Sequence, residues 1–160
     1  MIEIHYSLCR YKLQGSWWEK RVLTYKLTNY PNPANSKTRL TNAQVDESLE
    51  TAMRMWEQVT DIRFQKDWGN NVDIIILFGK GYHGQCTWGN FDGPGGYYAH
   101  ALYPENGGDI HMDDEEWFTV GPNPGISLLA TFVHEIGHSL GLEHSKVEAA
   151  IMWPIIKEEH

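Results

Sequence analysis

The stretch that decides the fold reads HEIGHSLGLEH and spans residues 134–144. Four residues advance an α-helix by about 6 Å, so His134 and His138 share one helix face and can bind the same metal ion. Glycine readily adopts the left-handed backbone conformation, so Gly141 can end this helix and turn His144 back towards that ion. The spacing therefore predicts a zinc site with three histidine ligands and one open position.

Glu135 follows the first of these histidines, where a carboxylate can accept a proton from a zinc-bound water and later deliver it to a leaving amine. Two histidines at helical spacing also occur on ordinary helix surfaces, and the five-residue motif alone leaves that alternative open. The longer pattern favours the zinc site, because Met152 follows His144 at the distance expected for a turn beneath the metal. By itself, Met152 would be interpreted as core filling.

Apolar periodicity predicts two helices and four strands. One helix extends from Thr41, in a capping-box pattern with Gln44, to about residue 59, and the other extends from about Ser127 to Gly141. Strands are predicted at residues 22–27, 62–65, 72–78 and 97–102, the third almost continuously apolar, as in a strand buried on both faces. This order of elements predicts a mixed sheet, and the glycine-rich residues 79–96 predict a long loop that something must order.

The composition narrows the classes of partner. A length of 160 residues suits one compact domain, and the formal net charge of -8 argues against nucleic acid and anionic membrane surfaces as partners. No apolar run approaches the roughly 20 residues that span a bilayer. Two cysteines, Cys9 and Cys86, are too few for a disulfide framework.

The zinc motif with Met152 is the metzincin signature. Residues 14–18, 23–25, 91–96, 99–101 and 107–113 resemble the catalytic domain of matrix metalloproteinases, the matrixins, so the resemblance covers nearly the whole chain. It implies a zinc-dependent endopeptidase that hydrolyses extracellular or matrix-type proteins through a zinc-bound water activated by Glu135. It also implies an α+β fold, with a twisted, mostly parallel five-stranded sheet, an antiparallel edge strand, two long helices and a small C-terminal subdomain.

The resemblance implies a second, structural zinc at His83, His100 and His111. The family's aspartate ligand corresponds here to Gln85, whose neutral amide is a weak zinc ligand, whereas the adjacent Cys86 offers a thiolate. Three histidines completed by water, or a weakly occupied site, are the alternatives.

Two calcium sites are also implied, and their oxygen ligands suit these loops. The first set is Asp92, Asp113 and Glu116 by their side chains, with Gly93, Gly95 and Tyr97 by their carbonyls. The second set is Asp73 and Asp109, with the carbonyls of Glu105 and Gly107. Without the resemblance, the acidic residues 113–116 would equally suit a solvated stretch. Calcium at millimolar concentration implies a secreted, extracellular protein.

The resemblance assigns substrate contacts as well. Ala99, His100 and Ala101 belong to an edge strand that pairs with an extended peptide, whereas Pro154, Ile155 and Ile156 border the pocket for the residue after the scissile bond. The implied partners are protein or peptide substrates, with protein inhibitors of metalloproteinases as further candidates, and the implied state is a monomer.

We expect residues 1–160 to form a single catalytic domain without the family's propeptide or hemopexin-like domain, ending before its C-terminal helix. A catalytically silent, metal-stabilised binding module is an alternative, favoured by Gln85 and the short C-terminus but opposed by the intact Glu135 and its three histidine neighbours. Hydrolysis of a small molecule, or another metzincin specificity, is opposed by the calcium-loop residues.

Overall fold

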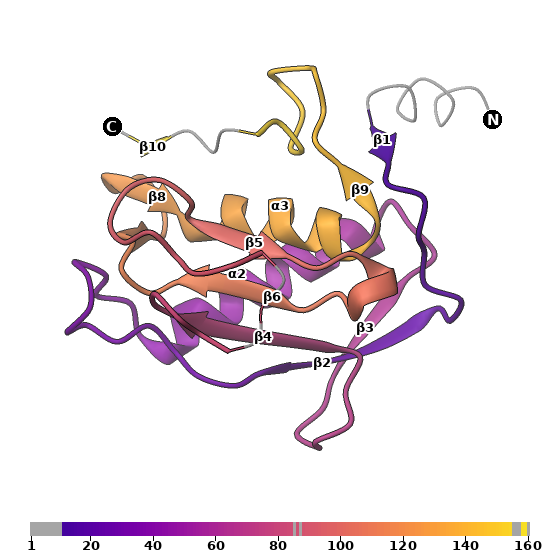
Figure 1. The fold of residues 1–160 in the computed structure, drawn as a ribbon, viewed down its shortest axis with the longest axis horizontal. Helices are drawn as coiled ribbons and strands as arrows, with labels where there is room; N and C mark the ends of the chain where they lie inside the picture. Colours follow the sequence, from indigo (N-terminus) through magenta and orange to yellow (C-terminus); the bar gives the residue numbers. More distant parts are fainter. Residues whose placement is uncertain (1–10, 85, 87, 155–157, 160) are drawn as a thin grey trace.

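The computed structural model describes residues 11–84, 86 and 88–154, and the backbone of residues 158–159. Its centre is a five-stranded sheet in the order β3-β2-β4-β6-β5 (Figure 1). The strands are β2 (Val22–Leu27), β3 (Arg63–Lys66), β4 (Ile74–Gly79), β5 (Ala99–Ala101) and β6 (Ile110–Asp113). β5 is antiparallel to β6 at one edge, and all other pairs are parallel. The predicted α+β fold is confirmed.

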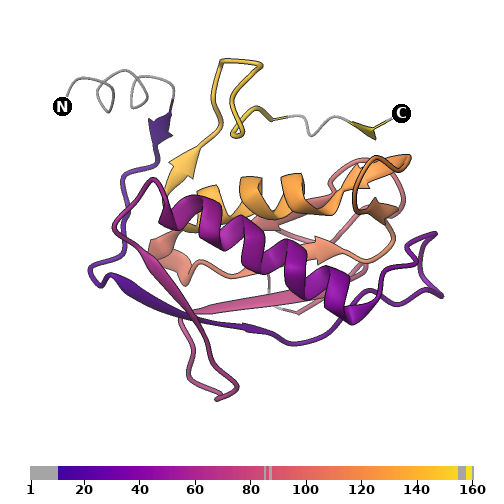
Figure 2. The same cartoon turned by 180° about the vertical axis from the view of Figure 1, so that it is seen from behind.

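Two helices, α2 (Asn42–Glu57) and α3 (Leu128–Ser139), lie side by side on one side of the sheet (Figure 2). α2 begins at Thr41 with the predicted capping box: Gln44 N donates to the Thr41 hydroxyl at 3.2 Å, and Thr41 N donates to the Gln44 side chain at 2.9 Å. The Ser127 hydroxyl caps α3 by accepting from Ala130 N at 3.3 Å. These caps satisfy amide groups that the first helical turn leaves without partners.

The core lies between the sheet and the two helices. Its largest fully buried side chains come from every layer: Phe118, Phe132, Leu23, Leu49, Ile74, Ile76, Ile110, Met112, Leu128, Ile136, Met152 and Val45. The indole of Trp56 on α2 donates a 2.9 Å hydrogen bond to the carbonyl of Val133 on α3, which fixes the two helices against each other.

The strands depart from their predicted form in two ways. Residues 74–79 of β4 alternate between buried and half-buried, because the helices cover only one face of the sheet, so the prediction of a strand buried on both faces was wrong. β5 is shorter than the predicted strand at residues 97–102, since only residues 99–101 are in register with β6. Tyr97, which precedes β5, is 75% exposed.

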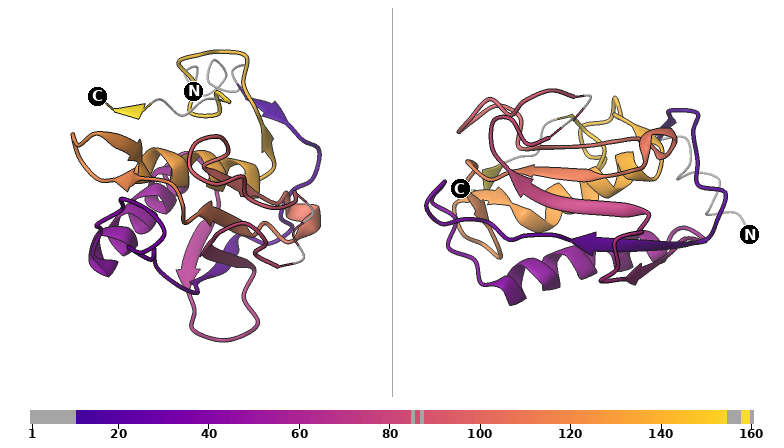
Figure 3. Two further views of the ribbon diagram at one scale, coloured as in Figure 1. Left: turned by 60° about the vertical axis from the view of Figure 1, so that its left-hand side comes forward. Right: turned by 60° about the horizontal axis from the view of Figure 1, so that its bottom comes forward.

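Short elements surround this frame (Figure 3). β1 (Lys12–Leu13) pairs with β9 (Leu142–Glu143), and β7 (Phe118–Thr119), β8 (Gly125–Ser127) and β10 (Glu158–Glu159) form a three-stranded sheet. A 3-10 turn, η1 (Pro104–Asn106), follows β5. Within the part of the chain that the structure describes, no helix combines the length and apolarity needed to cross a membrane.

Gly137 lies where α3 approaches α2 and the C-terminal segment most closely. A Cβ at this position would lie 3.0 Å from Trp56 Cζ2 and inside the van der Waals radius of Met152 Sδ. Only glycine leaves room for both side chains.

We predict that Gly137→Ala lowers the free energy of unfolding by about 1 to 2 kcal/mol, because overpacking outweighs the roughly 1 kcal/mol of helix propensity that alanine adds. Urea denaturation measures the change. Gly69→Ala is the matched control, since its Cβ would meet only the flexible side chain of Asp67. Equal effects of the two substitutions would show that the contact at Gly137 is unimportant.

Candidate metal centre and active-site cleft

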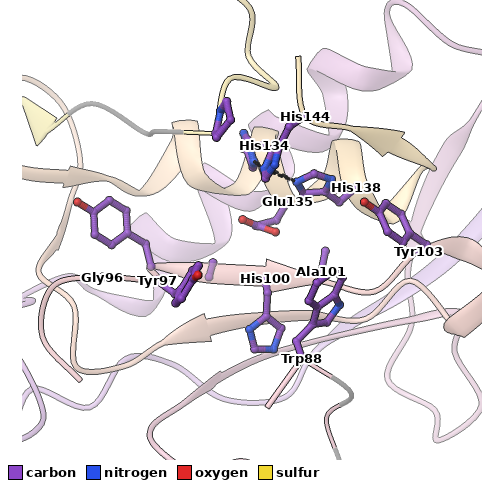
Figure 4. A pocket seen from close by; sticks show the side chains of 13 residues that line it. Trp88, Gly96, Tyr97, His100, Ala101, Tyr103, His134, Glu135, His138 and His144 are labelled. Atoms are coloured by element: carbon purple, nitrogen blue, oxygen red, sulfur yellow. Dashed lines mark hydrogen bonds between the residues drawn. The ribbon is translucent and has the colours of Figure 1, made fainter. Parts of the chain in front are cut away.

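Three imidazoles converge at the end of α3 that lies beside β9 (Figure 4). The Nε2 atoms of His134 and His138 are 3.1 Å apart, and they lie 3.2 Å and 3.1 Å from Nε2 of His144. A tetrahedral ion about 2.0–2.1 Å from each nitrogen would place these atoms about 3.3 Å apart. The three histidines therefore have the spacing that one zinc ion requires.

Backbone carbonyls fix the tautomers of two of these histidines. His134 Nδ1 lies 2.8 Å from the carbonyl oxygen of Ile151, and His138 Nδ1 lies 2.7 Å from that of Leu142. Because a carbonyl only accepts, each Nδ1 carries a proton and donates it. Each Nε2 then presents its lone pair to the centre of the cluster, as a metal ligand must.

Protonation does not stabilise this cluster. Burial, and then the charge of the neighbouring His134, lower the pKa of His138 to about 4. Burial also lowers the pKa of His134 and of His144. Three neutral imidazoles whose lone pairs face one another repel, so the arrangement favours a bound cation at their centre.

Glu135 is the buried acid of the site. Its side chain is 4% exposed, and its Oε2 has no hydrogen-bond partner among the described residues. Burial raises the pKa of Glu135 to about 8, which suits a group that exchanges protons near neutral pH. The carboxylate points into the cleft below the three imidazoles (Figure 4).

A cleft with a volume of about 400 Å³ opens in front of this centre. Its walls are formed by the edge strand, the histidine centre and the flanking loops: Trp88, Gly96, Tyr97, Tyr98, Ala99, His100, Ala101, Tyr103, His134, Glu135, His138, His144 and Pro154. Trp88 and Tyr103 were missed by the sequence analysis. The sequence feature that could have indicated them is an aromatic residue on each of the two segments that flank the predicted edge strand.

A second cluster joins the glycine-rich loop to the sheet edge. His100 on β5 lies opposite His111 on β6, with His100 Nε2 3.1 Å from His111 Nδ1 and 3.3 Å from His83 Nε2. Cys86 Sγ lies 3.0 Å from the same His100 nitrogen. The four potential ligand atoms all lie within 4.8 Å of one another, close enough to surround one ion.

The surroundings of this second cluster also favour a cation. The pKa of His100 falls to about 3 and that of His111 to about 4, first because both are buried and then because the neighbouring histidines repel a proton. The ring of Phe91 stacks on His83 with centroids 4.3 Å apart, and His83 Nδ1 lies 2.8 Å from the Gly81 carbonyl. Ordered by these contacts, His83 directs Nε2 towards its partners.

Comparison with known proteins identifies the family. The Matrixin family model matches residues 16–160. The chain belongs to the matrixin family. Stromelysin-3 of Mus musculus is 38% identical over 91% of the chain, matrilysin of Rattus norvegicus 38% over 89%, and macrophage metalloelastase of Rattus norvegicus 42% over 92%. The chain spans 28%, 51% and 30% of the length of these relatives, respectively.

The loop predicted to bind the first calcium carries a buried acid, one oxygen of which lacks a donor among the described residues. Asp113 is fully buried, and its Oδ2 has no hydrogen-bond partner among the described residues. Burial, and then the charges of Glu115, Asp92 and Asp114, raise the pKa of Asp113 to about 6, although a hydrogen bond from Glu115 N opposes the rise. The loop closes through Gly95 N, which donates to Glu116 Oε1 at 2.6 Å. A bound cation would offset the repulsion between these carboxylates.

The residues predicted to bind the second calcium are arranged differently. Asp73 accepts from Lys20 Nζ at 2.5 Å and from Thr24 N at 2.8 Å, and Asp109 accepts from Ile75 N at 2.8 Å. In residues 11–84, 86 and 88–154, groups of three or more histidine, cysteine or acidic ligand atoms occur only at the two histidine clusters. The acidic side chains expected to bind calcium do not form a comparable group.

Met152 is fully buried beneath α3, with its sulfur beside Gly137, and its carbonyl accepts a 2.7 Å hydrogen bond from Ser145 N. The predicted contacts of Gln85, Ile155 and Ile156 lie outside the described residues. Pro154 borders the cleft.

The Lys20–Asp73 ion pair makes a pH-dependent contribution to stability. Burial raises the pKa of Asp73, but hydrogen bonds from Lys20 and Thr24 together outweigh burial and hold it below the usual value. A lowered native-state pKa stabilises the fold above the unfolded-state value of about 4, and this stabilisation disappears as pH falls through the native-state pKa.

We predict that Lys20→Met lowers the free energy of unfolding by about 0.5 to 1 kcal/mol at pH 7, a value reduced for the exposure of Lys20. The loss should diminish below about pH 4, where Asp73 becomes protonated. Urea denaturation at pH 7, 5 and 3.5 without added calcium tests this. Lys26→Met is the control, because among the described residues Lys26 donates to the carbonyls of Trp68 and Gly69 and to no carboxylate. A loss that is independent of pH would contradict the prediction.

Proposed function

We propose that this matrixin is a zinc-dependent endopeptidase whose catalytic zinc is held by His134, His138 and His144, with Glu135 as general base. The observation that carries the proposal is the buried Oε2 of Glu135, which has no hydrogen-bond partner among the described residues and lies beside three converging imidazole nitrogens. A buried carboxylate without a hydrogen bond is costly, so its retention favours a catalytic use.

Each group of the site has a defined task in this proposal. Zinc, when bound, supplies a Lewis acid that polarises the scissile carbonyl and makes water acidic enough to attack it near neutral pH. Glu135 accepts the proton of the attacking water and then delivers it to the leaving amine. His134 and His138 keep their orientation through the carbonyls of Ile151 and Leu142. Met152 supports α3 from below.

An extended peptide fits the free side of β5. β5 is the last strand of the sheet order and pairs only with β6 among the described strands, so Ala99, His100 and Ala101 can add one more strand. Antiparallel pairing is the more stable choice per residue. Pro154, which lines the cleft, would together with Ile155 and Ile156 border the pocket for the residue after the scissile bond.

A second zinc would stabilise the sheet edge. We assign it to His83, His100 and His111 with the Cys86 thiolate as fourth ligand, because these four atoms lie within 4.8 Å of one another. A site with four protein ligands is closed, as structural zinc sites are. It would tie the glycine-rich loop to β5 and β6, and so hold the wall of the cleft in place.

Calcium, location and partners complete the proposal. Asp113 Oδ2, which lacks a partner within the described part of the chain, supports calcium at Asp92, Asp113 and Glu116, with the carbonyls of Gly93, Gly95 and Tyr97. The second calcium, at Asp73 and Asp109 with the carbonyls of Glu105 and Gly107, would have to displace Lys20. We further propose a secreted monomer, in which residues 1–160 form one domain that acts on extracellular proteins and is open to metalloproteinase inhibitors.

We predict that Glu135→Gln lowers kcat/KM for a quenched peptide by roughly 10²- to 10⁴-fold, because the amide cannot accept the proton. Zinc content should stay unchanged, since Glu135 is not a ligand. Glu50→Gln on α2 is the matched control and should keep full activity. Adding a zinc chelator should abolish the activity of the wild type and of the control, and zinc should restore it.

Two results would reject the proposed mechanism. Equal activity of Glu135→Gln and wild type would exclude Glu135 as the base. Zinc-replete wild type that cleaves no member of a peptide library would instead favour the silent binding module.

The assignment of Cys86 predicts a separate result. Cys86→Ser should retain about one zinc per chain after dialysis, where the wild type retains about two, because a neutral hydroxyl is a poor substitute for a thiolate. Cobalt substitution should give a thiolate-to-cobalt charge-transfer band in the wild type and none in the variant. Cys9→Ser is the control. Unchanged zinc content in Cys86→Ser would reject the thiolate ligand.

A further inference from the structure

Two aromatic side chains lie at one end of the cleft, beyond the histidine centre (Figure 4). Trp88 comes from the glycine-rich loop, and Tyr103 follows β5 directly before η1. Their rings meet edge to face, with centroids 6.4 Å apart and planes inclined by 65°. Tyr103 in turn meets His138 with centroids 5.9 Å apart. The pair therefore adjoins the residue that we assign as a zinc ligand.

Trp88 is held near the cleft without being buried. Its indole is 56% exposed, although exposure of so large an apolar surface to water is unfavourable. Gly89 N donates to the Cys86 carbonyl at 3.2 Å, and Phe91 N donates to the Gly81 carbonyl at 3.0 Å, so the chain around Trp88 is anchored on the cleft wall. Trp17 and Trp68 are also exposed, but they line neither the cleft nor the neighbouring hollow that shares Tyr103. Trp88 is thus an exposed apolar surface within the substrate channel.

The direction of β5 determines which half of a substrate meets this pair. β5 runs from Ala99 to Ala101 and so towards Tyr103, whereas Tyr97 lies on the other side of the histidine centre (Figure 4). A peptide that pairs antiparallel with β5 runs the opposite way, from the Tyr103 end towards the Tyr97 end. Its residues before the scissile bond therefore lie beside Tyr103 and Trp88.

We infer that Trp88 and Tyr103 form a subsite that binds an aromatic side chain of the substrate on the N-terminal side of the scissile bond. The inference rests on the proposed endopeptidase function and adds a sequence preference to it. Three rings can pack there in the edge-to-face and offset arrangements that aromatic groups prefer. The Tyr103 hydroxyl provides a polar end, as is common where one part of a ring is buried and another is wet.

The charges nearby favour an aromatic group over a cationic one. A ring face can also attract lysine or arginine. However, Lys12 and Lys146 line the neighbouring hollow that shares Tyr103, and Glu143 in that hollow is already paired with Lys12. A cationic substrate side chain would approach the ammonium group of Lys146, which the Lys12–Glu143 pair does not offset, so a neutral ring fits the subsite better.

The test uses quenched peptides that differ only at single positions before the scissile bond, each carrying phenylalanine, arginine or alanine. The wild type should cleave the phenylalanine peptide with a kcat/KM about fivefold above that of the alanine peptide at one of these positions. Trp88→Ala should reduce this ratio to about one, mainly by slowing cleavage of the phenylalanine peptide. Trp88→Phe should restore part of the preference.

Trp68→Ala is the matched control, because Trp68 is similarly exposed but contacts Lys66 away from the cleft, and it should keep the full preference. The zinc content of Trp88→Ala must equal that of the wild type, so that loss of preference is separated from damage beside Cys86. If Trp88→Ala loses zinc, Trp88→Phe and Trp88→Leu are used in its place. An equal phenylalanine preference in these two variants and the wild type would overturn the inference.

Several outcomes overturn the inference while leaving the proposed function intact. These are an unchanged phenylalanine preference in Trp88→Ala, a preference for arginine, or a Trp88-dependent preference only after the scissile bond. Absence of cleavage of every peptide by the zinc-replete wild type has a different meaning, because it contradicts the endopeptidase function itself.

Discussion

The convergence of three imidazole lone pairs on one point is the constraint on which the rest of the structure depends. Neutral nitrogens 3.1–3.2 Å apart repel unless a cation lies among them, and burial prevents a proton from serving as that cation. The protein must therefore hold the nitrogens in place by packing. α3 presents two of them on one face, and the chain turns sharply at Gly141, where φ is 97°, to bring back the third.

The packing around α3 supplies this rigidity. Trp56 attaches α3 to α2 through the Val133 carbonyl, and Met152 fills the space that Gly137 leaves open. The carbonyls that orient His134 and His138 come from residues 151 and 142, both in the segment that follows α3. A change in the position of this segment would therefore alter the ligand geometry directly. The metal centre and the segment that follows α3 are therefore structurally coupled.

The sequence predicted those features that depend on local pattern. The cap of α2 at Thr41, the start of α3 near Ser127, the strands β2, β3 and β4 and the histidine spacing each follow from residues close together in the chain. The two-sided burial expected for β4 failed because periodicity cannot say how many faces of a sheet are covered. β1 and β9 were missed because two-residue strands carry no periodic signal.

The candidate site divides in the same way. The histidine motif was readable because helical geometry alone places His134 beside His138. The closeness of Cys86 to His100 and of Trp88 to Tyr103 depends on how a glycine-rich loop folds back onto the sheet. Glycine permits many backbone conformations, so its spacing cannot specify which side chains such a loop brings together.

The contacts between the two ends of the chain bear on the order in which the molecule assembles. Trp18 Nε1 donates to the carbonyl of Ser139, 121 residues later, and Gln14 N donates to that of Gly141. These bonds satisfy carbonyls at the end of α3, beside the turn that leads to His144. Helices form within about a microsecond, whereas contacts between distant residues form later because closing a long loop costs entropy. His144 is therefore expected to reach its final position last. A newly made chain can then hold its metal only after residues 14–18 have packed against the end of α3.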